Sequence, residues 1–304
     1  MSARIGVIGS NMVDLVTTID RMPELGETVE APRFAIGAGG KGANQAAAAA
    51  KLGASVVMVS RVGDDTLRNF AALGIDKSHV RIVPGTSSGV APIFVDARGD
   101  NRILIVKGAN DHLLPADIDE AAPDLLGCGL ILLQLEIPLP SVYHAIDWAR
   151  AHSRPVLLNP APAPAALSLD RIAGIDFFMP NQTELATLTG MPTESLGEAE
   201  RAARHLLDRG MGRIVVTLGA AGALLVSREE VWHVPPVRVE ARDTTGAGDA
   251  FIGAFAAHWA DDGDLRGALR QATLYAAHSV TRAGSQSAFA GRDEFAAFCS
   301  AQRS

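Results

Sequence analysis

Short apolar runs alternate with segments of helical periodicity after Ile118, and this alternation restricts the fold more than any other feature. Parallel strands need a crossover between them, and a helix is its usual form. The sequence therefore predicts an α/β fold with three layers, α/β/α, in which helices cover both faces of a mostly parallel central sheet. The expected strands are 130–135, 156–159, 177–179 and 214–218, and the expected helices are 141–152 and 199–210.

Four segments nearer the N-terminus alternate between apolar and polar residues, which is typical of half-buried strands. They are 13–19, 28–36, 89–95 and 102–106, and the same part of the chain holds two expected buried strands, 5–8 and 55–62, and a short expected helix, 67–73. The four predict a small, mostly antiparallel sheet that covers one end of the main domain as a lid. We expect a single domain, 1–304, whose lid comes from about 13–36 and 89–107.

Charge and cysteine content restrict the partners. The formal net charge is -7 and no Lys/Arg cluster stands out, which disfavours a nucleic acid or an anionic membrane surface. No apolar run approaches the length that spans a bilayer, and the chain enters its first strand without a signal-peptide pattern. Cys128 and Cys299 are far apart, and the eight histidines show no HExxH pattern. A reduced, cytoplasmic setting without a zinc site is the simplest interpretation.

The stretch 243–251, DTTGAGDAF, joins an expected strand at 232–239 to an expected helix at 250–259. Two glycines at the mouth of a helix let several N–H groups point one way, and with the helix dipole they suit a phosphate or a developing negative charge. Asp249 lies where it can accept a proton from a hydroxyl. Taken alone, the stretch is more typical of a glycine-rich turn with an Asp N-cap.

A second glycine cluster, 37–45, opens an alanine-rich helix that Gly53 ends. It is not a Walker A loop, because no Ser or Thr follows Lys41 and the glycine spacing differs. The glycines let a small polar ligand approach the backbone, where Lys41 or Asn44 can hydrogen-bond to sugar hydroxyls. A flexible turn before a helix is the alternative.

Polar residues also follow two expected strands. Met12 and Asp14 come after the strand 5–8, at a carboxyl end where ligands bind in open α/β sheets, although Asp14 fits an exposed loop acid equally well. Asn181 and Glu184 follow the strand 177–179. Their spacing matches a capping box, and the functional alternative is a carboxylate that meets Mg²⁺-bound water.

In combination, these motifs resemble the ribokinase-like family of sugar kinases. Asn11 to Asp14, Gly39 to Gln45, Asn181-x-x-Glu184 and Asp243 to Asp249 appear in that order, and the resemblance covers nearly the whole chain. It implies ATP and Mg²⁺ as cofactors, an activating monovalent cation that is usually K⁺, and a homodimer joined through the lids. The expected partners are a small sugar and ATP.

The resemblance also implies a role for each matched residue. Asp249 is the expected catalytic base, and Gly246, Ala247 and Gly248 form the expected anion hole. The other expected sets are Met12, Asp14, Gly40, Lys41, Asn44 and Glu136 for the sugar; Asn181 and Glu184 for the phosphates and Mg²⁺-bound water; Thr217, Leu218, Gly219, Gly222, Gly248 and Thr273 for the nucleotide; and Asp243, Thr245, Ser279, Arg282 and Gly284 for the monovalent cation.

One departure bears on the substrate. Ribokinases usually carry Asn where this chain has Met12, whereas deoxyribokinases resemble this chain there and at 86–95. A thioether packs well against a CH₂ but cannot match an amide's hydrogen bonds to a hydroxyl. The resemblance therefore implies ATP-dependent phosphorylation of the 5-hydroxyl of 2-deoxy-D-ribose. An apolar contact rejects an added hydroxyl only weakly, so ribose can remain a slow substrate.

Several alternatives stay open. The substrate can be ribose, fructose or a nucleoside, although a chain that is only 5% aromatic offers little surface for stacking a base. A catalytically silent sugar-binding sensor would be free to lose Asp249 and Glu184, which are present. A Rossmann dehydrogenase needs G-x-G-x-x-G after its first strand, and 9–12 does not supply it. The segment after Asp65 is shorter than in the family, through a deletion or through missing residues.

Overall fold

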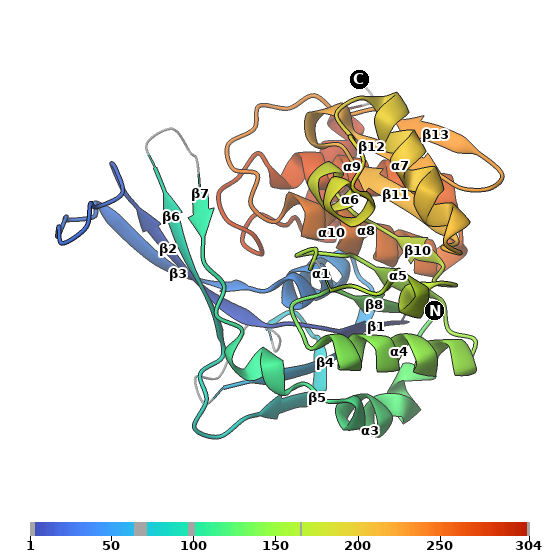
Figure 1. The fold of residues 1–304 in the computed structure, drawn as a ribbon. Helices are drawn as coiled ribbons and strands as arrows, with labels where there is room; N and C mark the ends of the chain where they lie inside the picture. The colour runs from blue at the N-terminus through green and yellow to red at the C-terminus, as the bar shows by residue number, and fades with distance from the viewer. Residues whose placement is uncertain (1–3, 64–71, 97–100, 165, 303–304) are drawn as a thin grey trace.

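Two sheets organise the computed structural model, which describes residues 4–63, 72–96, 101–164 and 166–302 (Figure 1). The larger has nine strands in the order β13-β12-β11-β10-β9-β8-β1-β4-β5, and the smaller has four in the order β3-β2-β6-β7. The strands are β1 (Arg4–Ile8), β2 (Met12–Thr18), β3 (Arg33–Gly39), β4 (Ser55–Val62), β5 (Asp76–Ile82), β6 (Gly89–Val95), β7 (Asn101–Ile103), β8 (Leu130–Leu133), β9 (Val156–Leu158), β10 (Phe177–Phe178), β11 (Arg213–Thr217), β12 (Ala223–Val226) and β13 (Val231–Val234).

Helices cover both faces of the nine-stranded sheet, because apolar side chains point to both sides of its strands. One buried cluster joins the sheet to α1, α8, α9 and α10, and a second joins it to α3, α4, α5, α6 and α7. The predicted three-layer α/β/α fold is confirmed. The helices are α1 (Lys41–Lys51), η1 (Gly108–His112), α3 (Pro115–Leu125), α4 (Leu139–Ala151), α5 (Leu169–Ile172), α6 (Gln182–Thr189), α7 (Leu196–Asp208), η2 (Gly219–Ala221), α8 (Ala247–Asp262), α9 (Leu265–Ser279) and α10 (Arg292–Ala301).

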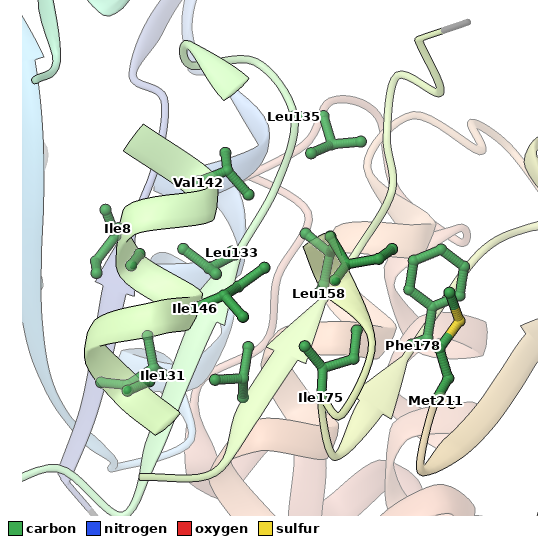
Figure 2. Packing of buried hydrophobic residues seen from close by; sticks show 14 of the residues in the cluster. Ile8, Ile131, Leu133, Leu135, Val142, Ile146, Leu158, Ile175, Phe178 and Met211 are labelled. Carbon is green, nitrogen blue, oxygen red and sulfur yellow. The ribbon is translucent and has the colours of Figure 1, made fainter. Parts of the chain in front are cut away.

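The strands from β5 through β4, β1, β8, β9 and β10 to β11 pair in parallel, and the pairs β11-β12 and β12-β13 are antiparallel. Figure 2 shows how this sheet is covered: Val142 and Ile146 of α4 lie over Ile131 and Leu133 of β8. All four residues are at most 1% exposed. Their burial stabilises the fold by roughly 1.5–3 kcal/mol for each fully buried aliphatic side chain.

The small sheet contains the four segments that the sequence predicts as half-buried strands. Its pairs β2-β3 and β6-β7 are antiparallel, and β2-β6 is parallel, so it is mostly antiparallel as expected. The largest differences are at β3, which spans Arg33–Gly39 rather than 28–36, and at β7, which ends at Ile103 rather than at 106. In Figure 1 this sheet stands beside the main body rather than within it.

One predicted strand is wrong over more than half of its length. Strand β13 ends at Val234, whereas the sequence predicts a strand over 232–239. Pro235 and Pro236 follow, and a proline has no N–H for the ladder with β12. The glycine-rich stretch before α8 is therefore reached through an irregular segment. The predicted helix 67–73 and the short segment after Asp65 lie mostly outside the described residues.

Candidate active site

The predicted catalytic residue, Asp249, lies in the first turn of α8 at the carboxyl-terminal edge of the nine-stranded sheet. Gly246 is the N-cap of that helix, with φ of 74°, a left-handed conformation that favours glycine. A side chain at Gly246 would also meet Ser285, whose Cβ lies 2.9 Å from the position of an added Cβ. The alternative in which Asp249 is the N-cap is therefore wrong, because it is the third residue of the helix.

Asp249 borders a cavity of about 180 Å³. Its lining includes Lys41 of α1, Asn159 and Ala161 after β9, Asn181 and Glu184 after β10, Thr217 of β11, and Gly246, Ala247 and Gly248 at the mouth of α8. A larger cavity, of about 260 Å³, lies beside the first residue of β9 and contains none of the predicted site residues. The chemistry is thus concentrated in the smaller cavity, where the three sequence motifs meet.

The Asp249 carboxylate is only 7% exposed and accepts hydrogen bonds on both oxygens. Asn44 Nδ2 donates to Oδ2 and Gln45 Nε2 donates to Oδ1, each at 2.9 Å. Both donors are neutral amides on consecutive residues of α1. Lys41 supplies a positive charge at this cavity. Burial alone would lower the pKa of Lys41, but the negative charges of Asp249, Glu136 and Glu184 raise it.

Glu136 and Asp14 form the sugar side of the predicted site. Glu136 follows β8, and its Oε2 accepts from Ser10 Oγ at 2.6 Å and from the Lys41 N–H at 2.8 Å. Burial raises the pKa of Glu136, and Lys41 opposes that shift. Burial, with the charges of Glu136 and Asp249, raises the pKa of Asp14 to about 6. Three carboxylates from separate elements therefore interact electrostatically at one place.

Met12, the first residue of β2, is 1% exposed and does not line the 180 Å³ cavity. It lies against Gly89 of β6, where an added Cβ would come within 2.8 Å of its Cγ. Asn110 binds the preceding residue on both sides of its backbone: Oδ1 accepts from the Asn11 N–H at 2.9 Å, and Nδ2 donates to the Asn11 carbonyl at 3.0 Å. Gly40, another residue predicted to contact the sugar, is the N-cap of α1.

Asn181 and Glu184 form the capping box that the sequence suggests. Glu184 N donates to Asn181 Oδ1 at 2.8 Å, and Asn181 N donates to Glu184 Oε2 at 2.9 Å. Both side chains nevertheless line the cavity. Burial raises the pKa of the Glu184 carboxyl, and the bond from Asn181 opposes the shift. The capping box and a position in the cavity wall are therefore compatible in this structure.

The expected nucleotide residues separate into two groups. Thr217 lines the cavity, and Leu218, Gly219 and Gly222 continue from it into the turn between β11 and β12, which the Leu218 N–H closes at 2.8 Å on the Gly222 carbonyl. Thr273 is 7% exposed and donates to the Leu269 carbonyl within α9. The structure does not bring Thr273 to the cavity.

The residues expected at a monovalent cation connect the 243–249 stretch to the segment after α9. Asp243 accepts from Thr245 N at 2.9 Å and from Gly284 N at 2.7 Å. Ser279 donates to the Ala276 carbonyl, and the Arg282 side chain pairs with Glu294. Within the part of the chain that the structure describes, no cluster of three or more His, Cys, Asp and Glu side chains suits a metal ion.

Four buried amides belong to this site although the sequence reasoning did not select them. Gln45 lies next to the predicted Asn44, Asn159 follows β9, Gln134 follows β8 and Gln286 lies in the loop after α9. The position of Asn159 at a strand's carboxyl end is a signal that was available. The interpretation of 130–135 as an apolar strand passed over Gln134.

Comparison with known proteins identifies the family. Residues 2–290 match the model of the pfkB family of carbohydrate kinases. The chain belongs to this family. It is therefore a sugar kinase, a phosphotransferase with an alcohol group as acceptor.

Among curated relatives, the chain is 54% identical to a deoxyribokinase of Salmonella typhi over 296 residues, which is 96% of this chain and 97% of that one. It is 39% identical to a ribokinase of Bacillus subtilis, over 95% and 96% of the two chains. The solved structure of Arabidopsis thaliana ribokinase complexed with ribose and ATP matches with a TM-score of 0.88 at 30% identity, over 98% of this chain and 99% of that one.

Proposed function

We propose that this kinase phosphorylates the 5-hydroxyl of 2-deoxy-D-ribose with ATP, giving 2-deoxy-D-ribose 5-phosphate. The observation that carries the proposal is the Asp249 carboxylate, held by two amides at the mouth of α8 and opening on the cavity. The 54% identity to a deoxyribokinase supports the sugar. Ribose is the second candidate, because the chain is also 39% identical to a ribokinase.

Asp249 is proposed to accept the proton of the 5-hydroxyl as that oxygen attacks the γ-phosphate. The dipole of α8 and the N–H of Gly248, in a turn where N–H groups lack intrahelical partners, favour the charge on the transferring group. The N–H of Ala247, which the sequence assigns to the same anion hole, donates instead to the Thr244 carbonyl at 3.2 Å. Lys41 supplies a positive charge to the same cavity.

The residues around the cavity suit the expected cofactors. Glu184 and Asn181 present oxygen ligands of the kind that Mg²⁺ prefers, and they would hold it through water beside the phosphates of ATP. Bound there, Mg²⁺ would neutralise phosphate charge. Asp243, Ser279 and the backbone around Thr245, Arg282 and Gly284 would hold a monovalent cation through oxygen atoms. The 217–222 turn would contact the nucleotide. Thr273, buried in α9, would support that region without lining the cavity.

The small sheet is proposed to select the sugar. Asp14 of β2 and Glu136, which follows β8, accept hydrogen bonds from sugar hydroxyls. Gly40, Lys41 and Asn44, at the start of α1, complete the proposed sugar site. The Asn44 amide already donates to Asp249 and accepts from Gln286 Nε2 at 2.9 Å, so it offers one remaining N–H. Met12 favours a CH₂ over a hydroxylated carbon at position 2 of the sugar.

The small sheet is also proposed to join two copies of the chain into a homodimer while it acts as the lid. Phe34 and Ile36 of the edge strand β3 are 57% and 69% exposed, and Leu104 beyond β7 is 62% exposed. Exposed apolar side chains on one sheet mark an interaction surface. No helix among the described residues is long and apolar enough to cross a membrane. A cytoplasmic location is part of the proposal.

An ADP-release assay with a panel of sugars tests the function. We expect turnover with 2-deoxyribose at a higher kcat/KM than with ribose, fructose or a nucleoside, and faster turnover with K⁺ present. A preference for ribose would move the assignment to the second candidate. Sugar-independent ADP release, or none with any sugar, would contradict the proposed function and favour a silent sensor.

A further inference from the structure

The Asp249 carboxylate is fixed by two arms of neutral amides, one on each of its oxygens. In the first arm, Gln134 donates to Gln45, which donates to Asp249 Oδ1. In the second, Gln286 donates to Asn44, which donates to Asp249 Oδ2. We propose that Gln45 is a positioning residue for phosphoryl transfer and that Gln134 acts through it. The inference rests on the proposed role of Asp249.

The direction of the first arm follows from Asp249 outward. An ionised carboxylate only accepts hydrogen bonds, so the Gln45 amide must turn its Nε2 toward Asp249. The other N–H of Nε2 meets Asn159 Oδ1 at 3.2 Å. Gln45 Oε1 then needs a donor, and Gln134 Nε2 supplies it at 2.7 Å. These three contacts fix the orientation of the Gln45 amide. Rotating it by half a turn would place its oxygen against the oxygens of Asp249 and Asn159, and its Nε2 against Gln134 Nε2.

This arrangement leaves one polar atom of Gln134 without a hydrogen bond. Its Oε1 is buried and has no hydrogen-bond partner, and a buried unpaired acceptor destabilises the folded state. Rotation of the Gln134 amide would bring that oxygen against Gln45 Oε1 and lose the bond. The absence of a side chain at Gly9 leaves room for the Gln134 amide as it lies, because an added Cβ there would come within 2.0 Å of Gln134 Oε1. The local structure therefore keeps the donor to Gln45 at the expense of another polar atom.

The arm is anchored on rigid elements. Gln134 directly follows β8, and Asn159 directly follows β9 and donates through Nδ2 to the Met179 carbonyl after β10 at 2.9 Å. Three neighbouring parallel strands thus determine where the Gln45 amide lies. Gln45 and Gln134 are both 0% exposed, so water does not compete for these bonds.

Close packing of α1 on α8 brings Gln45 to Asp249. Gly253 lies one turn after Asp249 on α8, and an added Cβ there would come within 2.5 Å of the Gln45 carbonyl oxygen and 2.6 Å of Ala48 Cβ. The absence of a side chain at Gly253 lets the two helices approach until the amides of Asn44 and Gln45 reach the carboxylate. Gln45 therefore holds the plane of the carboxylate so that its remaining lone pairs face the cavity.

The experiment compares Gln45→Met and Gln134→Met with Gln271→Met, a control on α9 whose amide lies outside this network. Methionine keeps the length of glutamine but has no N–H donor. We expect Gln45→Met to lower kcat on the order of 10-fold or more while the KM values for sugar and ATP stay within about threefold. Gln134→Met should lower kcat less, and the double variant should resemble Gln45→Met alone, because Gln134 acts through Gln45.

A second variant, Gln45→Glu, keeps the proposal testable if Gln45→Met fails to fold. A carboxylate at this position faces Asp249 with no donor, but its protonated form donates again. Its activity relative to the wild type should therefore rise as the pH falls. Referring it to the wild type accounts for Asp14, Glu136, Glu184 and Lys41, which face the same site and titrate in both proteins.

The outcomes separate the two proposals. Wild-type kcat in Gln45→Met, or equal losses in kcat and sugar affinity, would overturn the positioning role. Full additivity of the two substitutions would overturn the relay through Gln134. Asp249→Ala, measured beside them, tests the proposed base itself: if it is inactive while Gln45→Met is normal, only the positioning role fails.

Discussion

The two sheets of this kinase differ in what surrounds them. The inner strands of the nine-stranded sheet are covered on both faces, and all four residues of β8 are buried. Strand β3 of the small sheet is exposed over its first five residues. The amides and carboxylates at the end of the large sheet are consequently held by many bonds, whereas the small sheet leaves apolar side chains uncovered.

This difference suggests a division of labour. Atoms that must be placed accurately for phosphoryl transfer belong to the large sheet and its helices α1 and α8. The residues that we propose to distinguish sugars, Met12 and Asp14, belong to β2 of the small sheet. Substitutions beside the large sheet should therefore affect every sugar alike, and substitutions on the small sheet should change the choice among sugars.

Asp249→Ala should have the largest effect. Loss of the proposed base should lower kcat on the order of 10³-fold for every sugar, because general-base catalysis contributes that much. The fold should remain, since a buried carboxylate is removed from a site that holds three others, Asp14, Glu136 and Glu184. Initial rates and thermal unfolding measure both effects, and near-normal turnover would remove the mechanism.

Gly248→Ala should come next. An added Cβ at Gly248 meets no atom within 4 Å, and Gly248 lines the cavity, so the methyl group would occupy space that the phosphates need. We expect kcat/KM to fall on the order of 10²-fold with all sugars, the size typical of one lost oxyanion contact. The melting temperature should not fall. Gly246→Ala is the contrast, because its φ of 74° makes that variant less stable.

Asp14→Asn should weaken sugar binding yet stabilise the fold. The folded-state pKa of Asp14 is raised to about 6 from 3.8, so its charge destabilises the folded protein once the pH exceeds that range. Removal of the charge should add on the order of 1–3 kcal/mol at pH 8. The gain should shrink as the pH falls from 6 to 4 and vanish below it. Denaturant unfolding at both ends of this range measures it, and a gain that persists below pH 4 would exclude this cause.

Met12→Asn should shift the sugar preference on the order of 10-fold toward ribose, because an amide can hydrogen-bond to the added hydroxyl. The kcat for the preferred sugar should change little. The ratio of kcat/KM values for the two pentoses measures the shift, and an unchanged ratio would defeat the specificity argument.

Ile36→Lys should have the smallest effect on catalysis. A charge on the exposed apolar surface of β3 should dissociate the proposed dimer and leave the cavity unaltered. Light scattering after size-exclusion chromatography measures the mass. A wild-type monomer, or a variant that stays dimeric, would place the subunit contact elsewhere or remove it.

The sequence predicts the layers well because they depend on local patterns. Apolar runs predict β8 and β9, and the structure has both strands. The position after the first of these runs predicts Glu136 at a strand's carboxyl end, and Glu136 follows β8. Gln134 was missed because an apolar pattern tolerates one polar residue, and Gln286 because its contact with Asn44 joins residues 242 positions apart. The predicted strand 232–239 fails at Pro235, where a local rule on proline was available.

The most direct test of this division is the ratio of kcat/KM for 2-deoxyribose to that for ribose, measured together in the wild type, Gly248→Ala and Met12→Asn. The account predicts that Gly248→Ala keeps the wild-type ratio despite its large loss of activity, and that Met12→Asn changes the ratio while it keeps most of its activity. A ratio that moves in Gly248→Ala and stays constant in Met12→Asn would contradict it.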